Sequence, residues 1–170
     1  NLLNSSNYYC DYLVIDLSAG PKASSYPVRQ TNTPPLFLTN DDCRTKELWL
    51  RRLSPGTFIM GSPEDEIGHL RGEEQREIIL TKPFYIGIFE VTQMQWWLVL
   101  GENPSYYLGT DRPVESITYE MIRGACDEGI DWPQTHFSVS LGSFVGMLRE
   151  KTGILFDLPT EAQWEYACRA

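Results

Sequence analysis

The sequence predicts an α+β domain in which short strands and short helices are joined by long irregular segments. Short apolar runs with strand character alternate with helix-capping sequences, and Gly and Pro break the chain between them. Aromatic residues are abundant, with 5 Trp, 9 Tyr and 7 Phe among 170 residues. Such a composition indicates either a loop-rich core held together by rings or an adhesive aromatic surface. We favour the core, because segments without ladder hydrogen bonds need other support.

The overall composition excludes several classes of protein. The 42% hydrophobic and 22% charged residues are close to the globular average, which excludes wholesale disorder, collagen and coiled coils. Acidic residues outnumber basic ones by 23 to 14, and the resulting net charge of -9 argues against a nucleic-acid or anionic-membrane partner. The apolar runs are too short to predict a membrane span. A chain of 170 residues can bury a sizeable core without a metal or a disulfide.

Residues 1–45 are expected to form an N-terminal arm that packs on a domain spanning residues 46–170. Tyr12–Leu17 has the character of a single strand, and turns rich in Ser and Pro follow it as far as Thr33-Pro34-Pro35. Because one strand cannot make its own core, we expect the arm to lie on the rest of the chain. The N-terminus has neither the features of a signal peptide nor an initiator Met, so we expect a processed or trimmed start. The compartment stays open, with a secreted or periplasmic location favoured over the cytoplasm.

Four strands are expected in the next part of the chain. Leu48–Leu53 and Thr57–Met60 flank a Ser-Pro-Gly turn, and Glu77–Leu80 and Phe84–Glu90 follow a charged loop. That loop holds six carboxylates between residues 64 and 77. Their spacing lacks the alternating ladder that brings oxygen ligands together around calcium, so a solvated loop is the better interpretation.

Two helices are expected in the middle of the chain. Thr92 and Gln95 form a capping box that opens a helix ending near Gly101, and Thr118 caps a second short helix. The first helix carries adjacent tryptophans. Because neighbouring helical residues point about 100° apart, only one of these two rings can face the core.

Two further helices are expected near the C-terminus, separated by a strand at Ile154–Leu158. The first starts at Ser138 or Ser140 and ends at Gly153. Its apolar stripe consists of Leu141, Phe144, Val145 and Leu148. Thr160 and Gln163 form the capping box of the second. The stretch from Gly124 to Gln134 is expected to be irregular.

The cysteines and histidines give no catalytic or metal-binding pattern. The cysteines are Cys10, Cys43, Cys126 and Cys168. They lack C-x-x-C spacing, so we expect buried thiols or one disulfide, such as Cys10 with Cys43. His69 and His136 lack the Ser, Cys or Asp neighbours typical of a triad, and each is expected to be a surface or structural residue.

Five motifs follow one another from Gly56 onwards. They are Gly56-Thr57-Phe58-Ile59-Met60-Gly61-Ser62, then Phe84-Tyr85-Ile86 with Glu90-Val91-Thr92-Gln93, then Asn103-Pro104-Ser105, then Arg112-Pro113-Val114-Glu115, and finally Leu158-Pro159-Thr160-Glu161-Ala162-Gln163-Trp164-Glu165-Tyr166-Ala167. In this order and spacing the series resembles the formylglycine-generating enzyme, or sulfatase-modifying-factor, family over roughly Leu48 to Ala170.

The resemblance implies a C-type-lectin-like fold with low regular secondary structure, a small twisted sheet and a few short helices. It also implies that this chain holds only the N-terminal portion of the family domain, so the fold is apparently incomplete at the C-terminus. Within the motifs we expect architectural roles. Glu90 should accept hydrogen bonds from buried backbone or Arg donors, and Glu161, Trp164 and Glu165 should fix the last helix to the core.

The family's oxidases use residues that find no match in this chain. In these enzymes a cysteine pair in the C-terminal half binds copper(I), which prefers thiolates, and oxygen converts a target cysteine into formylglycine. Cys126 falls in a variable region, and Cys168 beside the last motif is expected to be a small buried residue. The calcium-binding positions of those enzymes also fall outside this chain. We therefore expect no catalytic residue, metal site or cofactor here, and copper or calcium only in a complete domain.

Two functions remain open. The chain is a scaffold or ligand-binding portion without a catalytic site of its own, or it is part of a copper-dependent oxidase that converts a sulfatase cysteine to formylglycine. A second chain or a C-terminal half would complete the domain in either case. A peptide or a carbohydrate is the expected ligand. The aromatic residues suited to contacting it are Trp96, Trp97, Tyr106 and Tyr107.

Overall fold

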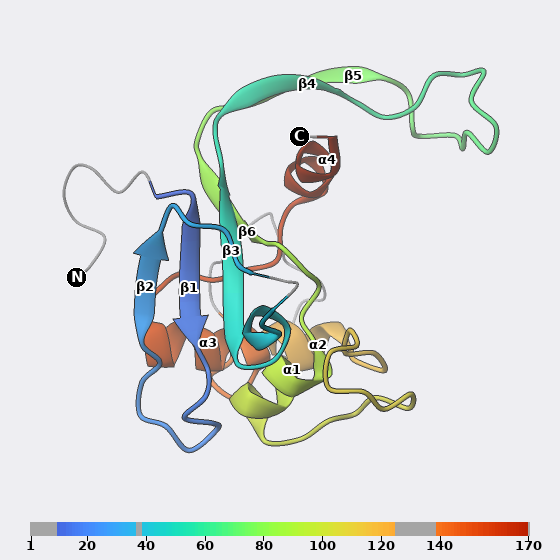
Figure 1. The fold of residues 1–170 in the computed structure, drawn as a ribbon. Helices are drawn as coiled ribbons and strands as arrows, with labels where there is room; N and C mark the ends of the chain where they lie inside the picture. Colours follow the sequence, from blue (N-terminus) through green and yellow to red (C-terminus); the bar gives the residue numbers. More distant parts are fainter. Residues whose placement is uncertain (1–9, 37–38, 125–138, 170) are drawn as a thin grey trace. The chain divides into compact units, whose positions relative to one another are not determined.

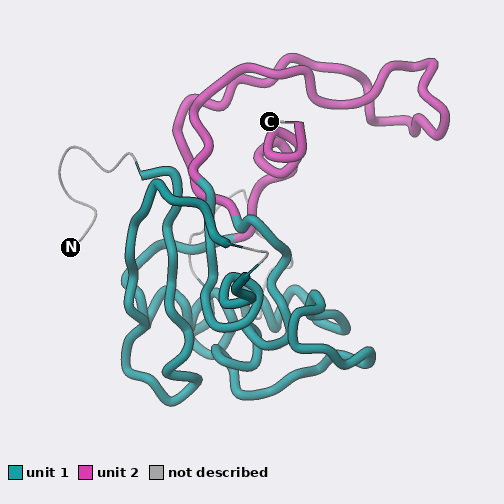
Figure 2. The backbone as a smooth tube through the Cα atoms, viewed as in Figure 1, with its two compact units in different colours: residues 1–51, 87–157 teal, residues 52–86, 158–170 magenta. Residues whose placement is uncertain are grey.

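The computed structural model describes residues 10–36, 39–124 and 139–169. Figure 2 shows its two compact units, which are residues 1–51 with 87–157 and residues 52–86 with 158–170. Each unit combines segments that lie far apart in the sequence. Helices and antiparallel strands occur together, which confirms the expected α+β class.

The first unit is built around strand β1 (Tyr12–Asp16), which confirms the strand expected there (Figure 1). β1 pairs antiparallel with β2 (Val28–Thr31) and with β3 (Glu47–Leu53), and it lies between them in one sheet. The three central residues of β1 are all buried. Because successive strand residues point to opposite faces, both faces of β1 are covered.

Strand β2 was not expected from the sequence. Its Val-Arg-Gln-Thr sequence follows Pro27 and has little apolar content, so no periodic pattern marks it. Hydrogen bonding to β1 is what makes it a strand. The boundary between arm and domain near residue 45 stays a prediction, although β1 lies between β2 and β3 in one sheet.

One hydrophobic cluster joins β1, β3 and the short 3-10 turn η1 (Asp42–Arg44). Val14, Cys43 and Trp49 form its buried centre, and Tyr12 packs against Trp49 edge-on with ring centroids 5.8 Å apart. The rings therefore support the irregular segments next to the sheet, as the aromatic content predicts.

The described residues of the first unit also form three helices: α1 (Gln93–Leu100), α2 (Tyr119–Arg123) and α3 (Phe144–Thr152). The capping box of Thr92 and Gln95 is confirmed, as are the Thr118 cap and the end of α1 at Gly101, which is left-handed. Both α1 and α2 contact α3.

The C-terminal part of the first unit differs from the expectation in two ways. Helix α3 begins at Phe144 with Ser143 as its cap, not at Ser138 or Ser140, because the Ser143 hydroxyl accepts from the Gly146 amide at 3.1 Å. Leu141 therefore precedes the helix and is exposed. The strand expected at Ile154–Leu158 is absent, and the Phe156 carbonyl instead accepts from the Arg149 side chain at 2.7 Å.

The second unit is a hairpin covered by one helix. Strand β4 (Gly56–Met60) pairs with β5 (Arg76–Leu80), β6 (Phe84–Gly87) follows, and α4 (Glu161–Arg169) contacts β4. The expected capping box of Thr160 and Gln163 is confirmed by reciprocal hydrogen bonds of 2.9 and 3.2 Å.

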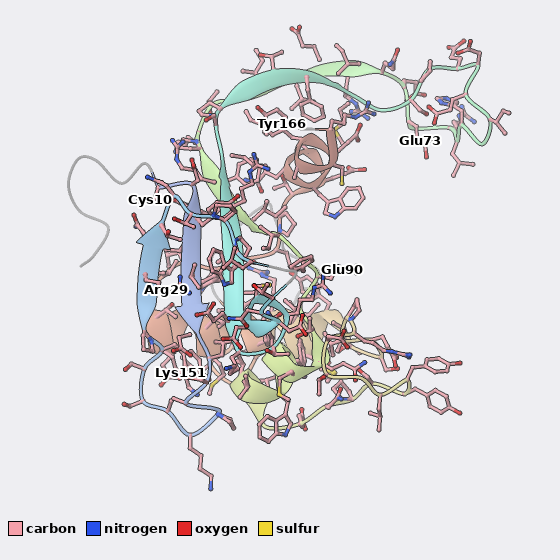
Figure 3. All side chains as sticks on the ribbon, in the orientation of Figure 1. Cys10, Arg29, Glu73, Glu90, Lys151 and Tyr166 are labelled. Atoms are coloured by element: carbon pink, nitrogen blue, oxygen red, sulfur yellow. The ribbon has the colours of Figure 1, made fainter. Side chains whose placement is uncertain are left out.

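Tyr166 connects α4 to the hairpin (Figure 3). Its ring lies 5.3 Å from that of Phe58, and its hydroxyl donates to the Ser54 carbonyl at 3.2 Å. Glu165 accepts from the Gly61 amide at 2.9 Å, so its expected role is confirmed. Trp164 is 59% exposed, and its expected role is wrong because two helical positions span about 200°, which places it opposite Tyr166.

The remaining expectations concern Glu161, the irregular stretch from Gly124 to Gln134, and membrane spans. Glu161 is exposed, so it does not fix α4. Most of the irregular stretch from Gly124 to Gln134 lies outside the described residues, as do Cys126 and His136. Within the described part of the chain, the helices are too short or too polar to cross a membrane.

Candidate functional site

The surface best prepared for a ligand is residues 102–118, which connect α1 to α2 and which we call the tyrosine loop. Its second half runs beside the start of α1. The backbone amide of Gln93 donates to the Arg112 carbonyl at 2.9 Å, and an isolated antiparallel bridge pairs Thr92 with Pro113. These main-chain contacts fix the return of the loop.

The buried Gln93 side chain holds the loop from inside. Its oxygen accepts from the Asn103 side chain and from the Gly109 amide, both at 3.0 Å. Its nitrogen donates to the carbonyls of Tyr107 and Pro113 at 2.9 and 3.3 Å. The two donors and two acceptor sites of the amide are therefore all used. Only 2% of Gln93 is exposed, so these bonds are shielded from water.

Glu115 holds the same loop from its other side. One carboxylate oxygen accepts from the amides of Tyr106 and Tyr107 at 2.5 and 2.9 Å, and the other accepts from the Ser116 hydroxyl. The Ser116 hydroxyl and then these two amides hold the pKa of Glu115 below its usual 4.5. Ser116 has φ 58, in the left-handed region that serine rarely adopts, so the turn is strained where the carboxylate is placed.

Tyr106 and Tyr107, the tyrosine pair, project from this fixed backbone. They are 78% and 65% exposed, and Leu108 beside them is 72% exposed. The two rings are nearly perpendicular, with an interplanar angle of 84° and centroids 4.9 Å apart. A rigid backbone lowers the entropy lost on binding, so this arrangement suits ligand contact.

The two predicted tryptophans have different environments. Trp96 is 1% exposed and stacks on Phe144 with ring centroids 4.8 Å apart, so its ring faces are not available to a ligand. Trp97 is 44% exposed. The expectation that only one ring faces the core is confirmed. Trp97 and the tyrosine pair stay candidates for ligand contact.

Gln93, Asn103 and Glu115 were not predicted as site residues, although each belongs to a motif seen in the sequence. The sequence feature that could have indicated them is that these motifs lie close together, between residues 93 and 115. The sequence could not show that their side chains bond to the backbone of one loop, because those partners lie up to 20 residues away.

A second polar cluster lies in the loop between β4 and β5. The Ser62 hydroxyl lies 2.8 Å from Nδ1 of His69 and 3.1 Å from a carboxylate oxygen of Glu73. In a catalytic triad the acid contacts the imidazole, whereas both groups here contact the serine. The six carboxylates of this segment are exposed, which confirms the solvated loop.

The first unit also buries charged side chains away from the tyrosine loop. Arg123, only 3% exposed, forms a two-pronged ion pair with Asp157 at 2.7 and 3.1 Å, and Arg149 pairs with the same carboxylate at 2.7 Å. These pairs connect α2 and α3 to residue 157. The expectation for Glu90 is wrong, because Glu90 is exposed and Asp157 accepts the buried Arg donors instead.

Lys151 on α3 is buried and joins the helix to the segment after β1 (Figure 3). Its ammonium donates to the Pro21 carbonyl at 2.6 Å and to the Tyr26 hydroxyl at 3.2 Å. Burial lowers the pKa of Lys151 and raises that of Tyr26. This group contributes to packing of the first unit.

Cys43 is a free thiol, so the suggested disulfide between Cys10 and Cys43 does not form. Cys43 is buried, and that burial raises the pKa of its thiol. Cys168 is exposed, contrary to expectation, because α4 buries none of its residues fully. Within residues 10–36, 39–124 and 139–169, no three His, Cys, Asp or Glu side chains are grouped as metal ligands.

Comparison with known families agrees with this architecture. Residues 40–170 match the family model described as the sulfatase-modifying factor enzyme 1-like domain. The mixed helices and antiparallel strands fit the C-type-lectin-like α+β class of that domain. The match covers more than half of the chain, and the protein belongs to the sulfatase-modifying-factor family.

One curated relative is the Chaperone protein LppX of Paenibacillus barcinonensis. It is 34% identical over 100 residues, and the alignment covers 49% of this chain and 35% of the relative. The chain therefore spans only about a third of that relative's length. No solved structure matches the chain.

Proposed function

We propose that this chain is the ligand-binding portion of a sulfatase-modifying-factor-like domain, without a catalytic site of its own, and that the tyrosine loop contacts the ligand. One observation carries the proposal: Tyr106, Tyr107 and Leu108 are consecutive, large and exposed, on a backbone fixed by Gln93 and Glu115. Single exposed apolar residues are ordinary, but a contiguous group on a rigid loop is typical of an interaction surface.

The ligand that fits this loop best is a polypeptide. Carbohydrate sites combine ring stacking with polar groups that reach the sugar hydroxyls. In the tyrosine loop, the Gln93 amide and the Glu115 carboxylate already bond to the protein itself. The naming of one relative as a chaperone also favours a polypeptide ligand.

The test measures binding of a reduced, carboxymethylated unfolded polypeptide to the full chain, with fluorescence anisotropy as the readout. Exchanging both Tyr106 and Tyr107 for Ser should weaken binding roughly tenfold or more, because exposed aromatic anchors carry much of an interface's energy. Leu141→Ser is the matched control, since Leu141 is 70% exposed in the same unit but lies outside the loop. Equal affinity of the double variant and the wild type would refute the proposal.

The second candidate is part of a copper-dependent oxidase that converts a sulfatase cysteine to formylglycine, with its catalytic cysteines elsewhere in a complete domain. Family membership favours it. Formation of a peptide aldehyde from a sulfatase-type cysteine by the full-length, copper(I)-loaded protein would establish it. Native mass spectrometry would reveal whether a second chain or a C-terminal half completes the domain.

A further inference from the structure

We infer that the free edge of strand β2 is a second binding surface, which takes an extended polypeptide segment as an added strand. This inference goes beyond the proposed function, because β2 lies outside the tyrosine loop. Either surface can therefore fail while the other stands.

The hydrogen-bond pattern of β2 shows which of its backbone groups are free. At the end of β1, the Asp16 amide donates to the Pro27 carbonyl at 2.9 Å. Bonded and non-bonded positions alternate along an antiparallel pair. Counting from Pro27, Arg29 is therefore the next residue bonded to β1, whereas Val28 and Gln30 direct their amides and carbonyls away from β1. Among the turn and loop bonds of the described residues, none reaches these outward groups.

The open edge is limited to the middle of β2. Among the described strands, β2 pairs with β1 alone, and Figure 1 shows it on the side of β1 away from β3. Before the strand, the Tyr26 amide donates to the Lys151 carbonyl at 2.9 Å. After it, the Thr33 amide donates to the Thr31 hydroxyl at 3.0 Å. Gln30 also has a buried side-chain oxygen without a hydrogen-bond partner in the part of the chain that the structure describes.

The spacing of the free groups specifies the kind of ligand. Residues two positions apart in a strand are separated by about 6.7 Å. Val28 and Gln30 thus each offer one donor and one acceptor at that interval along the edge. Another extended chain presents its own amides and carbonyls at the same interval, which is how a peptide adds to the edge of a sheet.

Charge and side chains narrow the choice of extended partner. The chain carries a net charge of -9, so a second copy is repelled and a neutral or basic segment is favoured. The side chains of Val28 and Gln30 are half-buried, and Arg29 is already paired with Glu47 at 2.6 Å. We therefore expect a β-branched residue opposite Val28 and no need for an acidic residue opposite Arg29.

The experiment measures amide hydrogen exchange of the full chain by NMR, with and without the acetylated peptide Thr-Val-Thr-Val-Thr-Lys. Binding should slow exchange of the Val28 and Gln30 amides by at least about tenfold, because each gains a hydrogen bond. The Arg29 amide, which already faces β1, should be slow in the free chain and serves as an internal control. A copy of the peptide with N-methyl groups on its central residues keeps the side chains but loses the donors, so it should not slow exchange.

Protein variants locate the effect. Gln30→Pro removes one outward amide, and proline is tolerated on an edge strand where the amide has no partner. Peptide affinity should fall roughly 3- to 10-fold, which corresponds to one hydrogen bond. Leu141→Ser, in the same unit but outside β2, should behave as the wild type. The exchange data from the wild type decide the question even if Gln30→Pro does not fold.

The outcomes separate the edge from the alternatives. If the peptide binds without slowing the Val28 and Gln30 amides, or if the N-methylated copy slows them equally, the inference is overturned. Absence of binding up to roughly 1 mM peptide also overturns it. If these amides slow with protein concentration alone, the partner is a second copy and the inferred polypeptide is wrong. If the slowing disappears when Tyr106 and Tyr107 are both exchanged for Ser, the peptide binds at the tyrosine loop, which overturns the edge and leaves the proposed function standing.

Discussion

Replacing Gln93 by Met tests whether one buried amide holds the tyrosine loop in place. Met has a similar length but no amide, so it removes four hydrogen bonds without opening a large cavity. At about 1 kcal/mol net for each bond, the loss is about 4 kcal/mol. Loop groups that become hydrated in the variant recover part of this free energy. We therefore expect the free energy of unfolding of the first unit to fall by about 2–4 kcal/mol.

Urea denaturation followed by tryptophan fluorescence measures this free energy, and amide hydrogen exchange locates the change. The Gly109 amide, which donates to Gln93 at 3.0 Å, should lose its protection. Gln75→Met is the matched control, because Gln75 is exposed. Its unfolding free energy should stay within about 0.5 kcal/mol of wild type. A loss below about 1 kcal/mol in Gln93→Met, with Gly109 still protected, would refute the reasoning.

Three further predictions concern single contacts. The folded-state pKa of Glu115 is depressed, so its stabilisation of the loop is fully present above the ordinary pKa of 4.5 and is lost as pH falls through the lower folded-state pKa. The NMR signals of the two tyrosine amides should follow this loss, and Glu115→Gln should abolish their pH dependence. Gly61→Ala should destabilise the second unit by about 1–3 kcal/mol more than Gly68→Ala, because both have positive φ but only at Gly61 does a Cβ meet a backbone oxygen, at 2.5 Å; equal unfolding free energies would contradict this. Gly56→Ala should lower the free energy of unfolding by about 1–3 kcal/mol, since the added Cβ meets the Tyr166 hydroxyl. Adding Tyr166→Phe to this variant removes that hydroxyl and should recover about 1 kcal/mol in a double-mutant cycle. Strict additivity of the two substitutions would show that the two residues do not touch.

Local interactions explain which parts of the fold the sequence predicts. The boxes of Thr92 and Thr160 each involve residues three positions apart, so the pattern alone identifies them. The strand at Tyr12–Asp16 is likewise visible as an apolar run. By contrast, β2 has no apolar periodicity, and the segment at 154–158 has a strand-like composition but is not a strand. Both depend on partners distant in sequence.

The candidate site shows the same division. The exposed tyrosine pair could be proposed from residue type and a loop position, and helical geometry predicted that only one of Trp96 and Trp97 faces the core. The roles of Gln93 and Glu115 could not, because each acts on backbone groups that the sequence does not place beside them. Residue type also misled at Cys168 and Trp164, which are exposed although their kinds are usually buried.

The sequence by itself determines the caps of α1, α2 and α4, the α+β class, the acidic charge and the family, because these follow from neighbouring residues or from motifs in order. Tertiary structure alone decides which tryptophan is buried, which carboxylate pairs with the buried arginines, and how the tyrosine loop is held. The physical reason is that capping and periodicity act within one turn or strand. The hydrogen bonds that fix a loop join segments that only folding brings together.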